Sequence, residues 1–410
     1  MSGCDDLKDH LTSFEQAIEN LMIAAQPLTE LELVSTDLAL GRVLATSLVS
    51  TLDVPPLDNS AMDGYALNSA DVTQTGDSLP VSQRICAGEM GDPLQAGTAA
   101  RIFTGAPIPA NADAVVMQEF CDRQADQLII NQTVKAGQNI RNAGEDIRSG
   151  DNILQAGTKL RAQELGLAAS IGCSPIKVFR RLKVALFFTG DELVEPGKPL
   201  KAGQIYDSNR YTLLGLLHTL GCEPIDLGIV PDNLEATKQA LQKAASQADL
   251  VITSGGVSVG EEDYVRIALQ ALGQLNMWRI AMKPGKPLAF GQVDNTHFLG
   301  LPGNPVSAFV TFCLFVSPFI KKMQGMTDPL PQSLHIKANF VWSKASKRRE
   351  YLRVKLTQDQ QGQSQANLFV HQGSGVLTST SWADGLVTIP IGKTLESGDL
   401  VEYLSFTSLL

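Results

Sequence analysis

Residues 249–263 read DLVITSGGVSVGEED, a short apolar run followed by glycines and then by three acids. The segment is not a P-loop, because no Gly-Lys-Ser/Thr follows the glycines, and it lacks the G-x-G-x-x-G spacing of the dinucleotide fingerprint. It stands where a parallel strand would lead into a helix, which is where α/β proteins place their ligands. The stretch therefore predicts an α/β domain with a ligand-binding loop after this strand.

Strand-like and helix-like segments alternate on both sides of this stretch. The expected strands are 181–190, 223–230, 249–254, 276–282 and 297–302, and the expected helices are 208–221, 233–247, 261–273 and 305–325. Such alternation predicts a doubly wound parallel sheet over residues 181–328.

The rest of the chain has a different pattern. Residues 51–140 contain short apolar segments broken by Gly, Pro, Asn and Asp, and residues 329–410 are similar, so both predict β domains. Helical spacing covers residues 13–25 and 157–172. We expect Thr158 to cap the second of these helices and Gly172 to stop it.

Size and composition restrict the class of protein. A chain of 410 residues predicts two to four domains. The net charge of −10 disfavours nucleic acid as a partner, and the one compact basic run, 344–349, is interpreted as solvated surface. The longest apolar run, 309–320, is too short for a membrane span. The six cysteines form no C-x-x-C pair, and the N-terminus has no signal-peptide pattern, so we expect a cytoplasmic protein.

The candidate site comes from the loops that follow the expected strands. Their sequences are TGDE (189–192), PDN (231–233), SGGVSVGEED (254–263), KPGK (283–286) and LPGNP (301–305). Each loop alone also fits a turn followed by a helix cap. Their convergence on one edge of a parallel sheet favours a ligand site.

The residue types in these loops indicate a phosphate ligand with a metal. Glycine-rich turns before helices expose N–H groups that bind anions, and Lys283 and Lys286 add positive charge. The acids Asp191, Glu192, Asp232 and Asp263 would hold Mg²⁺, which binds through carboxylates together with phosphate oxygens.

The N-terminal half holds dense polar stretches at 53–66, 104–107 and 144–146. Their local chemistry fits loops with Asx turns and assigns no catalytic role.

Ten segments taken together resemble the molybdopterin molybdenumtransferase family, which includes the E domain of gephyrin. They are DNSAMDGYA (58–66), RIFTGAPIP (101–109), AVVMQE (114–119), NIRNAGEDI (139–147), FFTGDEL (187–193), GQIYDSNR (203–210), SGGVSVGEEDY (254–264), MKPGKPLAFG (282–291), GLPGNPVSA (300–308) and HQGSG (371–375). The resemblance covers nearly the whole chain in order.

The resemblance implies a reaction and an architecture. Family members insert molybdenum from molybdate into molybdopterin, which arrives adenylylated by a partner adenylyltransferase. They hydrolyse its pyrophosphate bond with Mg²⁺, release AMP and form molybdenum cofactor. The implied domains are a discontinuous elongated linker domain (1–50 and 141–180), an inserted β domain (51–140), an α/β molybdopterin-binding domain (181–328) and a C-terminal β barrel (329–410). Members are homodimers, and each site lies between the α/β domain of one subunit and the inserted β domain of the other.

The resemblance also assigns residues. The implied catalytic residues are Asp63 and Thr104, reaching the site from the second subunit, and Glu192, Asp232 and Asp263, the last three also holding the metal. The implied phosphate or pterin contacts are Ser254, Gly255, Gly256, Ser258, Gly260, Lys283 and Lys286, with Pro302, Gly303 and Pro305 shaping the pocket. Arg141 and Arg353 are further candidate anion ligands.

Two alternatives stay open. The α/β domain resembles the adenylyltransferase partner, so the chain could catalyse adenylylation instead, although the extra domains favour insertion. The second alternative is a non-enzymatic pterin-binding scaffold. The acids at 63, 192, 232 and 263 argue against a purely structural role.

Overall fold

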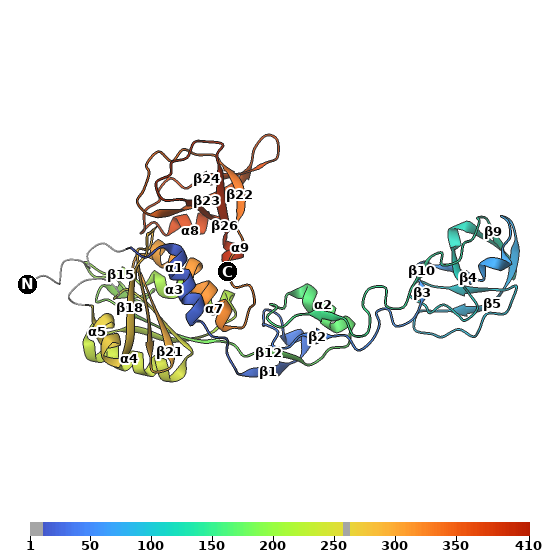
Figure 1. The fold of residues 1–410 in the computed structure, drawn as a ribbon, viewed down its shortest axis with the longest axis horizontal. Coiled ribbons are helices and arrows are strands. Elements are labelled where there is room, and N and C mark those ends of the chain that lie inside the picture. The colour runs from blue at the N-terminus through green and yellow to red at the C-terminus, as the bar shows by residue number, and fades with distance from the viewer. Residues whose placement is uncertain (1–10, 257–262) are drawn as a thin grey trace, which may run out of the picture.

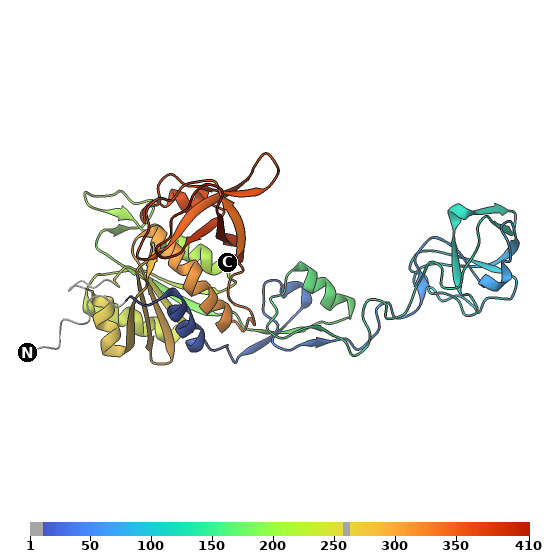
Figure 2. The same cartoon turned by 45° about the horizontal axis from the view of Figure 1, so that its top comes forward.

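A computed structural model describes residues 11–256 and 263–410, which form an extended molecule (Figure 1). The α/β domain and the C-terminal barrel lie together at one end. An arm of paired strands leads from them to the inserted β domain at the other end, and the second view shows the same separation (Figure 2).

The α/β domain is built on one mixed sheet. In the described residues its order is β16 (Glu223–Val230), β13 (Lys183–Thr189), β17 (Leu250–Ser254), β21 (Thr296–Leu301), β20 (Pro287–Val293) and β18 (Gly273–Arg279). The first four strands are parallel, which confirms the α/β prediction. Strand β20 was not predicted and runs antiparallel to both of its neighbours.

Helices cover both faces of this sheet. Alternate residues of β13 point to opposite sides, so Val184, Leu186 and Phe188 pack with one group of helices and Ala185 and Phe187 with the other. The first group is α1 (Phe14–Ala24), α3 (Ser208–Thr219), α6 (Pro305–Thr311) and α7 (Ser317–Met323), with the π-helical turn Phe312–Val316 between the last two. The second group is α4 (Leu234–Gln247) and α5 (Tyr264–Leu272).

The continuous helical stretch Pro305–Met323 has the length and apolar composition of a membrane span, with a mean hydropathy of 1.5. Within its most apolar 18-residue window, 89% of the stretch is buried inside the protein, as in the core helix of a globular domain. Its apolar character is therefore explained by packing against the sheet.

The arm has a small core of its own. It pairs β1 (Leu31–Val34) with β12 (Ile176–Phe179) and β2 (Leu48–Val49) with β11 (Asn152–Leu154), and it carries the 3-10 turn Thr36–Leu38 and helix α2 (Ala162–Ser170). Within the predicted linker range 1–50, α1 packs on the α/β domain, so the arm starts after it.

Helix α2 starts later than we predicted. Lys159 forms a bridge with Val43, so the chain there is still extended, and Arg161 instead of Thr158 occupies the cap position. Its backbone N–H and guanidinium both donate to Glu164. Gly172, at a φ of +69°, follows the end of the helix as expected.

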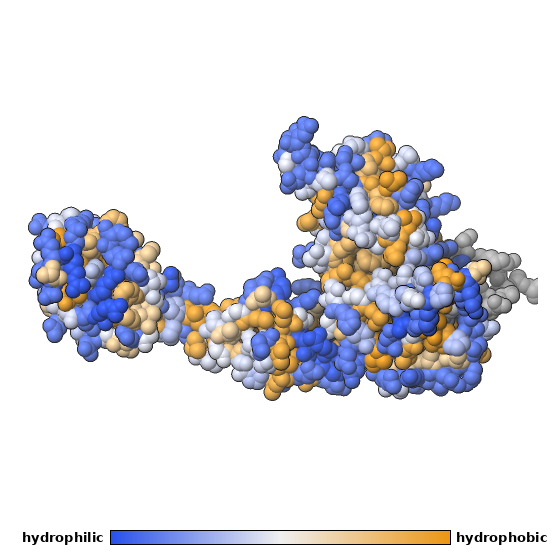
Figure 3. All heavy atoms as spheres, turned by 180° about the vertical axis from the view of Figure 1, so that it is seen from behind, coloured by the Kyte–Doolittle hydropathy of each residue, from blue (hydrophilic) through white to orange (hydrophobic). Residues whose placement is uncertain are grey.

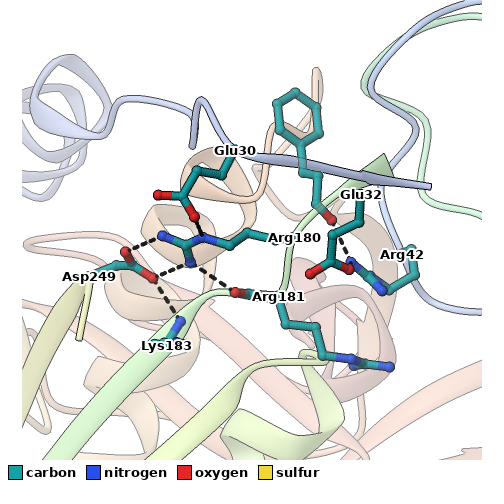
Figure 4. Close-up of polar contacts among 8 residues, drawn as sticks. Glu30, Glu32, Arg42, Arg180, Arg181, Lys183 and Asp249 are labelled. Atoms are coloured by element: carbon teal, nitrogen blue, oxygen red, sulfur yellow. Dashed lines mark hydrogen bonds and ion pairs between the residues drawn. The ribbon is translucent and has the colours of Figure 1, made fainter. Parts of the chain in front are cut away.

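An ion-pair network joins the arm to the α/β domain (Figure 4). Arg180 pairs with Glu30 of the arm and donates from Nη1 and Nη2 to the two carboxylate oxygens of Asp249, each at 2.7 Å. Asp249 also accepts from the backbone N–H of Lys183 at 2.8 Å. Arg42 pairs with Glu32 beside this network.

The inserted domain is β-rich, as predicted. Its described strands are β4 (Gly64–Leu67), β5 (Ser78–Ile85), β6 (Ala99–Ile102), β7 (Ala114–Met117), β8 (Cys121–Gln124) and β9 (Gln127–Ile130), joined in the order β7-β4-β6-β5-β9-β8, while β3 (Asn59–Ser60) pairs with β10 (Ile140–Arg141). The 3-10 turns Ser69–Asp71 and Gln118–Phe120 lie between strands.

The C-terminal domain is a closed barrel, as predicted. In the described part of the chain, five strands form the ring β23 (Arg349–Gln358), β24 (Ser364–Leu368), β22 (Leu334–Ala338), β26 (Leu400–Ser405) and β25 (Gly385–Ile389), which returns to β23. Helices α8 (Thr378–Trp382) and α9 (Phe406–Leu409) complete it. The short strand β19 (Met282–Lys283) comes from the α/β domain and pairs with β23, so the two domains share a sheet.

Candidate functional site

Two adjoining cavities lie at the carboxyl edge of the parallel strands. The first, about 540 Å³, is lined by Gly255, Gly256, Lys283 to Pro287, Pro302 to Asn304, Ser307, Arg348 and Gln372 to Ser374. The second, about 430 Å³, is lined by Thr189, Glu192, Leu193, Ile205 to Asn209, Ser254, Gly255 and Gly303 to Pro305. Both share Gly255, Gly303 and Asn304, so the expected loops do converge.

Gly255, directly after β17, lines both cavities, and Gly256 lines the first. Gly256 has a φ of +64°, and a β-carbon there would lie 2.6 Å from Cγ2 of Val265, so a larger residue does not fit. The N–H of Gly255 donates to the carbonyl of Leu301 at 3.1 Å. These contacts hold Gly255 and Gly256 in place beside the Pro302–Gly303 turn.

The first cavity is cationic. Lys283, Lys286 and Arg348 line it. Nζ of Lys283 lies 2.8 Å from Oε1 of Glu350, a barrel residue that is only 3% exposed. Oε2 of Glu350 accepts from the indole of Trp342 at 2.7 Å. Lys286 forms no ion pair with any described residue, so its charge is available to an anion.

The basic run at 344–349 is partly a site element, which corrects its interpretation as solvated surface. Arg348 lines the first cavity and donates to the carbonyl of Met282 at 3.3 Å. Arg349 pairs with Glu15 and stacks on the ring of Phe14, 5.1 Å from its centroid.

Arg353 lies behind the first cavity and lines neither one. It is fully buried and donates to Oγ of Ser379 at 3.0 Å and to the carbonyls of His371 and Gly373 at 3.4 and 3.1 Å. Burial lowers its pKa to about 10, so the side chain stays charged at neutral pH. Arg353 therefore holds the loop that carries Gln372 to Ser374 into the cavity.

The second cavity is acidic. Glu192 contributes an exposed carboxylate, and Asp207 contributes one that is only 2% exposed. Oδ1 of Asp207 caps α3 by accepting from the N–H of Arg210 at 3.1 Å, whereas its buried Oδ2 accepts no hydrogen bond from the described residues. Burial raises the pKa of Asp207.

Asn209 ties this cavity to the glycine loop. Its Nδ2 donates to Oγ of Ser254 at 2.8 Å and to the carbonyl of Gly303 at 2.7 Å. Ser254 in turn donates to the carbonyl of Pro302 at 2.9 Å. Asp207, Asn209 and Arg348 are site residues that the sequence reasoning missed, although GQIYDSNR was among the segments that carry the resemblance.

The predicted metal ligands do not form one cluster in the described residues, among which no three His, Cys, Asp or Glu residues gather. Asp232 is exposed after β16 and lines neither cavity, and its neighbour Asn233 caps α4. Asp263 is 4% exposed and caps α5 through the N–H of Arg266 at 3.0 Å. Ser258 and Gly260 lie outside the described residues, so the set remains a prediction.

Asp63 and Thr104 lie together in the inserted domain. Oδ1 of Asp63 accepts from the backbone N–H and from the hydroxyl of Thr104, both at 2.8 Å. These hydrogen bonds lower the pKa of Asp63, so it is ionised at neutral pH. Arg141 is exposed on β10 of the same domain. Within one chain, the inserted domain that carries all three lies at the opposite end of the molecule from the α/β domain, whose residues line the cavities (Figure 1).

Comparisons with known proteins agree along the chain. Family models match residues 12–172 (MoeA N-terminal region, domain I and II), 185–322 (probable molybdopterin binding domain) and 335–406 (MoeA C-terminal region, domain IV). The molybdopterin molybdenumtransferase of Haemophilus influenzae is 42% identical over 93% of this chain and 95% of its own. That of a Nostoc species is 39% identical over 93% and 89%.

A solved structure has the same fold. The molybdopterin biosynthesis MoeA protein of Pyrococcus horikoshii superposes with a TM-score of 0.83 at 29% identity, covering 97% of this chain and all of that one. With the three family models and the identities to both named enzymes, this shows that the chain belongs to the molybdopterin molybdenumtransferase (MoeA) family, a family of transferases in molybdenum cofactor synthesis.

Proposed function

We propose that this protein inserts molybdenum from molybdate into adenylylated molybdopterin, with Mg²⁺-dependent hydrolysis of the phosphoanhydride and release of AMP. One observation carries the proposal: a cationic cavity adjoins an acidic cavity at the carboxyl edge of the sheet, and Gly255 lines both. The proposed reaction brings together molybdate, which is an anion, and a phosphoanhydride with its bound cation. A site for both substrates therefore needs a cationic and an acidic surface.

The cationic cavity suits molybdate. Lys286, Arg348 and Ser374 line this cavity, and no Asp or Glu is among its described lining residues. Molybdate is a dianion, and such groups bind oxyanions through charge-assisted hydrogen bonds. Each cavity has the volume usual for a small-molecule site, and the pair has room for an extended ligand.

The acidic cavity suits the phosphoanhydride and its cation. The orphaned, buried Oδ2 of Asp207 is an unused metal ligand, and Glu192 lies in the same cavity. Mg²⁺ bound here would supply charge neutralisation at the phosphate oxygens. Asp232 and Asp263 remain the other candidates, on the resemblance.

The chemistry needs no covalent nucleophile and no redox partner. Water attacks the phosphorus of the adenylyl group, a carboxylate accepts its proton, and the bond to the bridging oxygen breaks as AMP leaves. Joining molybdate to the dithiolene is a condensation, because the two thiol protons leave with one molybdate oxygen as water. The chain therefore acts by binding, orientation and electrostatics.

The site is proposed to need a second copy of the chain. Asp63 and Thr104 cannot reach the cavities of their own chain, because the arm separates them (Figure 2). The arm exposes large apolar side chains, and Figure 3 shows apolar surface along it. These residues are Leu31, Leu33, Leu38, Leu40, Val49, Leu52 and Leu57. Exposed apolar clusters of this kind mark protein interfaces, so we assign the arm to a homodimer.

AMP release tests this function. Adenylylated molybdopterin, supplied by the upstream adenylyltransferase, which we expect to be a cytoplasmic partner, is incubated with Mg²⁺ with and without molybdate. We expect AMP release that depends on molybdate and yields cofactor able to activate an apo-molybdoenzyme. Adenylylation of free molybdopterin by Mg-ATP without insertion would identify an adenylyltransferase. Tight pterin binding with neither activity would identify a scaffold.

A further inference from the structure

We propose that Arg84 and Arg101, stacked on Phe103 beside Asp63, form an anion clamp for the phosphoanhydride of the ligand held by the second subunit. This rests on the proposed function and adds to it. The clamp would bring positive charge to the same phosphate groups that Asp63 approaches. It lies in the inserted domain, far from the cavities of its own chain (Figure 2).

Strand pairing brings the two arginines together. In the parallel pairing of β5 with β6, Arg84 lies opposite Arg101, so both side chains are on one face of the sheet. Cζ of each guanidinium is 4.7 Å from the centroid of the Phe103 ring. Cζ of Arg101 is also 5.1 Å from the ring centroid of Tyr65. Stacking fixes the guanidinium planes, which reduces the entropy lost when an anion binds.

The charge of this pair is available to a ligand. Five other arginines, Arg42, Arg161, Arg180, Arg210 and Arg349, each pair with a carboxylate. In the described residues neither Arg84 nor Arg101 makes such an ion pair. Arg101 donates to two neutral acceptors, the carbonyl of Gly64 at 3.1 Å and Oε1 of Gln118 at 2.6 Å. Most of its five N–H donors remain for a ligand.

The two arginines lie beside the predicted catalytic residues Asp63 and Thr104. Thr104 directly follows Phe103 and holds Asp63 through two hydrogen bonds to Oδ1. Arg101 is close enough for its charge to contribute to the lowered pKa of Asp63. A phosphate bound by the guanidiniums would therefore lie beside the Asp63 carboxylate.

A phosphoanhydride is the anion that fits best. Planar guanidinium forks match phosphate oxygens in pairs, and two of them span adjacent phosphates. Nucleic acid is disfavoured, because the chain carries a net charge of −10. The two arginines could instead form ion pairs with carboxylates of the second subunit. The experiment below distinguishes such ion pairs from binding of a phosphoanhydride.

The test compares R84Q and R101Q, singly and together, with the control R123Q. Arg123 lies on β8 of the same domain, and its Nε donates to the carbonyl of Ala125 at 3.0 Å. Steady-state AMP release gives KM and kcat for adenylylated molybdopterin. Each clamp variant should raise KM about tenfold, as for loss of one charge-assisted hydrogen bond. R123Q should match the wild type.

Heterodimers show whether the clamp acts across subunits. One chain carries R84Q and R101Q and the other carries E192Q. A clamp that serves the second subunit leaves one intact site, and about half the wild-type activity returns. A clamp that serves its own chain leaves no intact site.

The possible results distinguish a failure of the clamp proposal from a failure of the proposed function. Wild-type AMP release with unchanged KM in R84Q and R101Q would overturn the clamp and leave the proposed function standing. Monomeric variants by light scattering would show that the arginines meet carboxylates of the second subunit, which also overturns it. Calorimetric titration with pyrophosphate gives a readout without turnover, and weaker binding by the double variant than by R123Q supports the clamp.

Discussion

Lys283, at the carboxyl edge of the α/β sheet, is paired with Glu350 of the C-terminal barrel, with 2.8 Å between Nζ and Oε1. The carboxylate is buried, while the side chain of Lys283 is half exposed and lines the cationic cavity. The pair therefore joins the two domains and moderates the charge that a bound anion meets.

Replacing Glu350 with Gln should separate these effects. The amide removes the counter-charge of Lys283, so molybdate should bind roughly threefold more tightly, as for loss of a partly exposed pair. The free energy of unfolding should fall by about 1–3 kcal/mol because the hydrogen bonds of a buried carboxylate are lost. Calorimetry and urea titration measure these changes. E396Q, an exposed change on the same barrel, should alter neither, and unchanged molybdate affinity in E350Q would contradict the assignment.

Asp207→Asn tests the acidic cavity. Asn caps helices as well as Asp, so α3 should persist. The orphaned oxygen becomes a poorer metal ligand, and the Mg²⁺ concentration for half-maximal AMP release should rise at least about tenfold. An unchanged Mg²⁺ dependence would remove Asp207 from the metal site.

Comparing D207N with the wild type also tests how Asp207 makes the stability of the folded protein depend on pH. Burial raises the pKa of Asp207, so the folded state binds this proton more tightly than the unfolded state. Stability from this group is present below the unfolded pKa and is lost as the pH rises through the folded pKa. The difference in Tm, wild type minus D207N, should therefore fall as the pH rises from 3.5 through the acidic range. A difference that rises with pH would contradict the burial of this carboxyl.

The junction in Figure 4 should set the direction of the arm. Asp249→Asn removes one partner of a largely buried pair, and the free energy of unfolding should fall by about 3 kcal/mol. Spin labels on the inserted and α/β domains should then show a broader distance distribution by pulsed EPR. K198A breaks an exposed pair with Glu195 and should change neither quantity. An equally narrow distribution in D249N would mean that the strands alone fix the arm.

The apolar arm should be the dimer interface. Leu33→Glu with Leu38→Glu places charges on side chains that are 68% and 67% exposed, so the fold should survive. The protein should become monomeric by light scattering, and AMP release should be lost with it. Val370→Glu changes an 84% exposed residue off the arm and should leave the dimer intact. A dimeric double variant would place the interface elsewhere.

Alternating patterns predicted the α/β domain and both β domains because buried strands and amphipathic helices have distinct periods. We did not predict strand β20, which forms a hairpin with β21. The turn between the two strands is Asp294 and Asn295, with Asp294 at a φ of +52°. That pair is a two-residue hairpin turn whose left-handed backbone Asp tolerates. The expected strand 276–282 also proved to be two, since Met282 and Lys283 pair with the barrel.

The loops of the site were predictable, but some of its residues were not. Strand order brought Gly255, Lys286 and Gly303 to one edge, as the pattern required. Arg348, directly before β23, lines the first cavity although we interpreted it as solvated surface, and Arg353 on β23 is buried outside the lining of both cavities. The sequence does not show which of these arginines reaches the cavity, because that depends on how the barrel packs on the α/β domain. Asp207 reads as an ordinary helix cap, and only the fold reveals that its second oxygen is buried without a partner.

Strand β19 has a consequence for how this protein can be divided. Met282 and Lys283 are the only described α/β residues that add a strand to the barrel sheet, and Lys283 belongs to the anion cavity. A fragment ending at residue 328 would keep the sheet and its helices, but this segment would lose its hydrogen-bonding neighbour. The candidate site thus extends beyond the probable molybdopterin binding domain at residues 185–322, and we expect a minimal functional unit to retain the barrel.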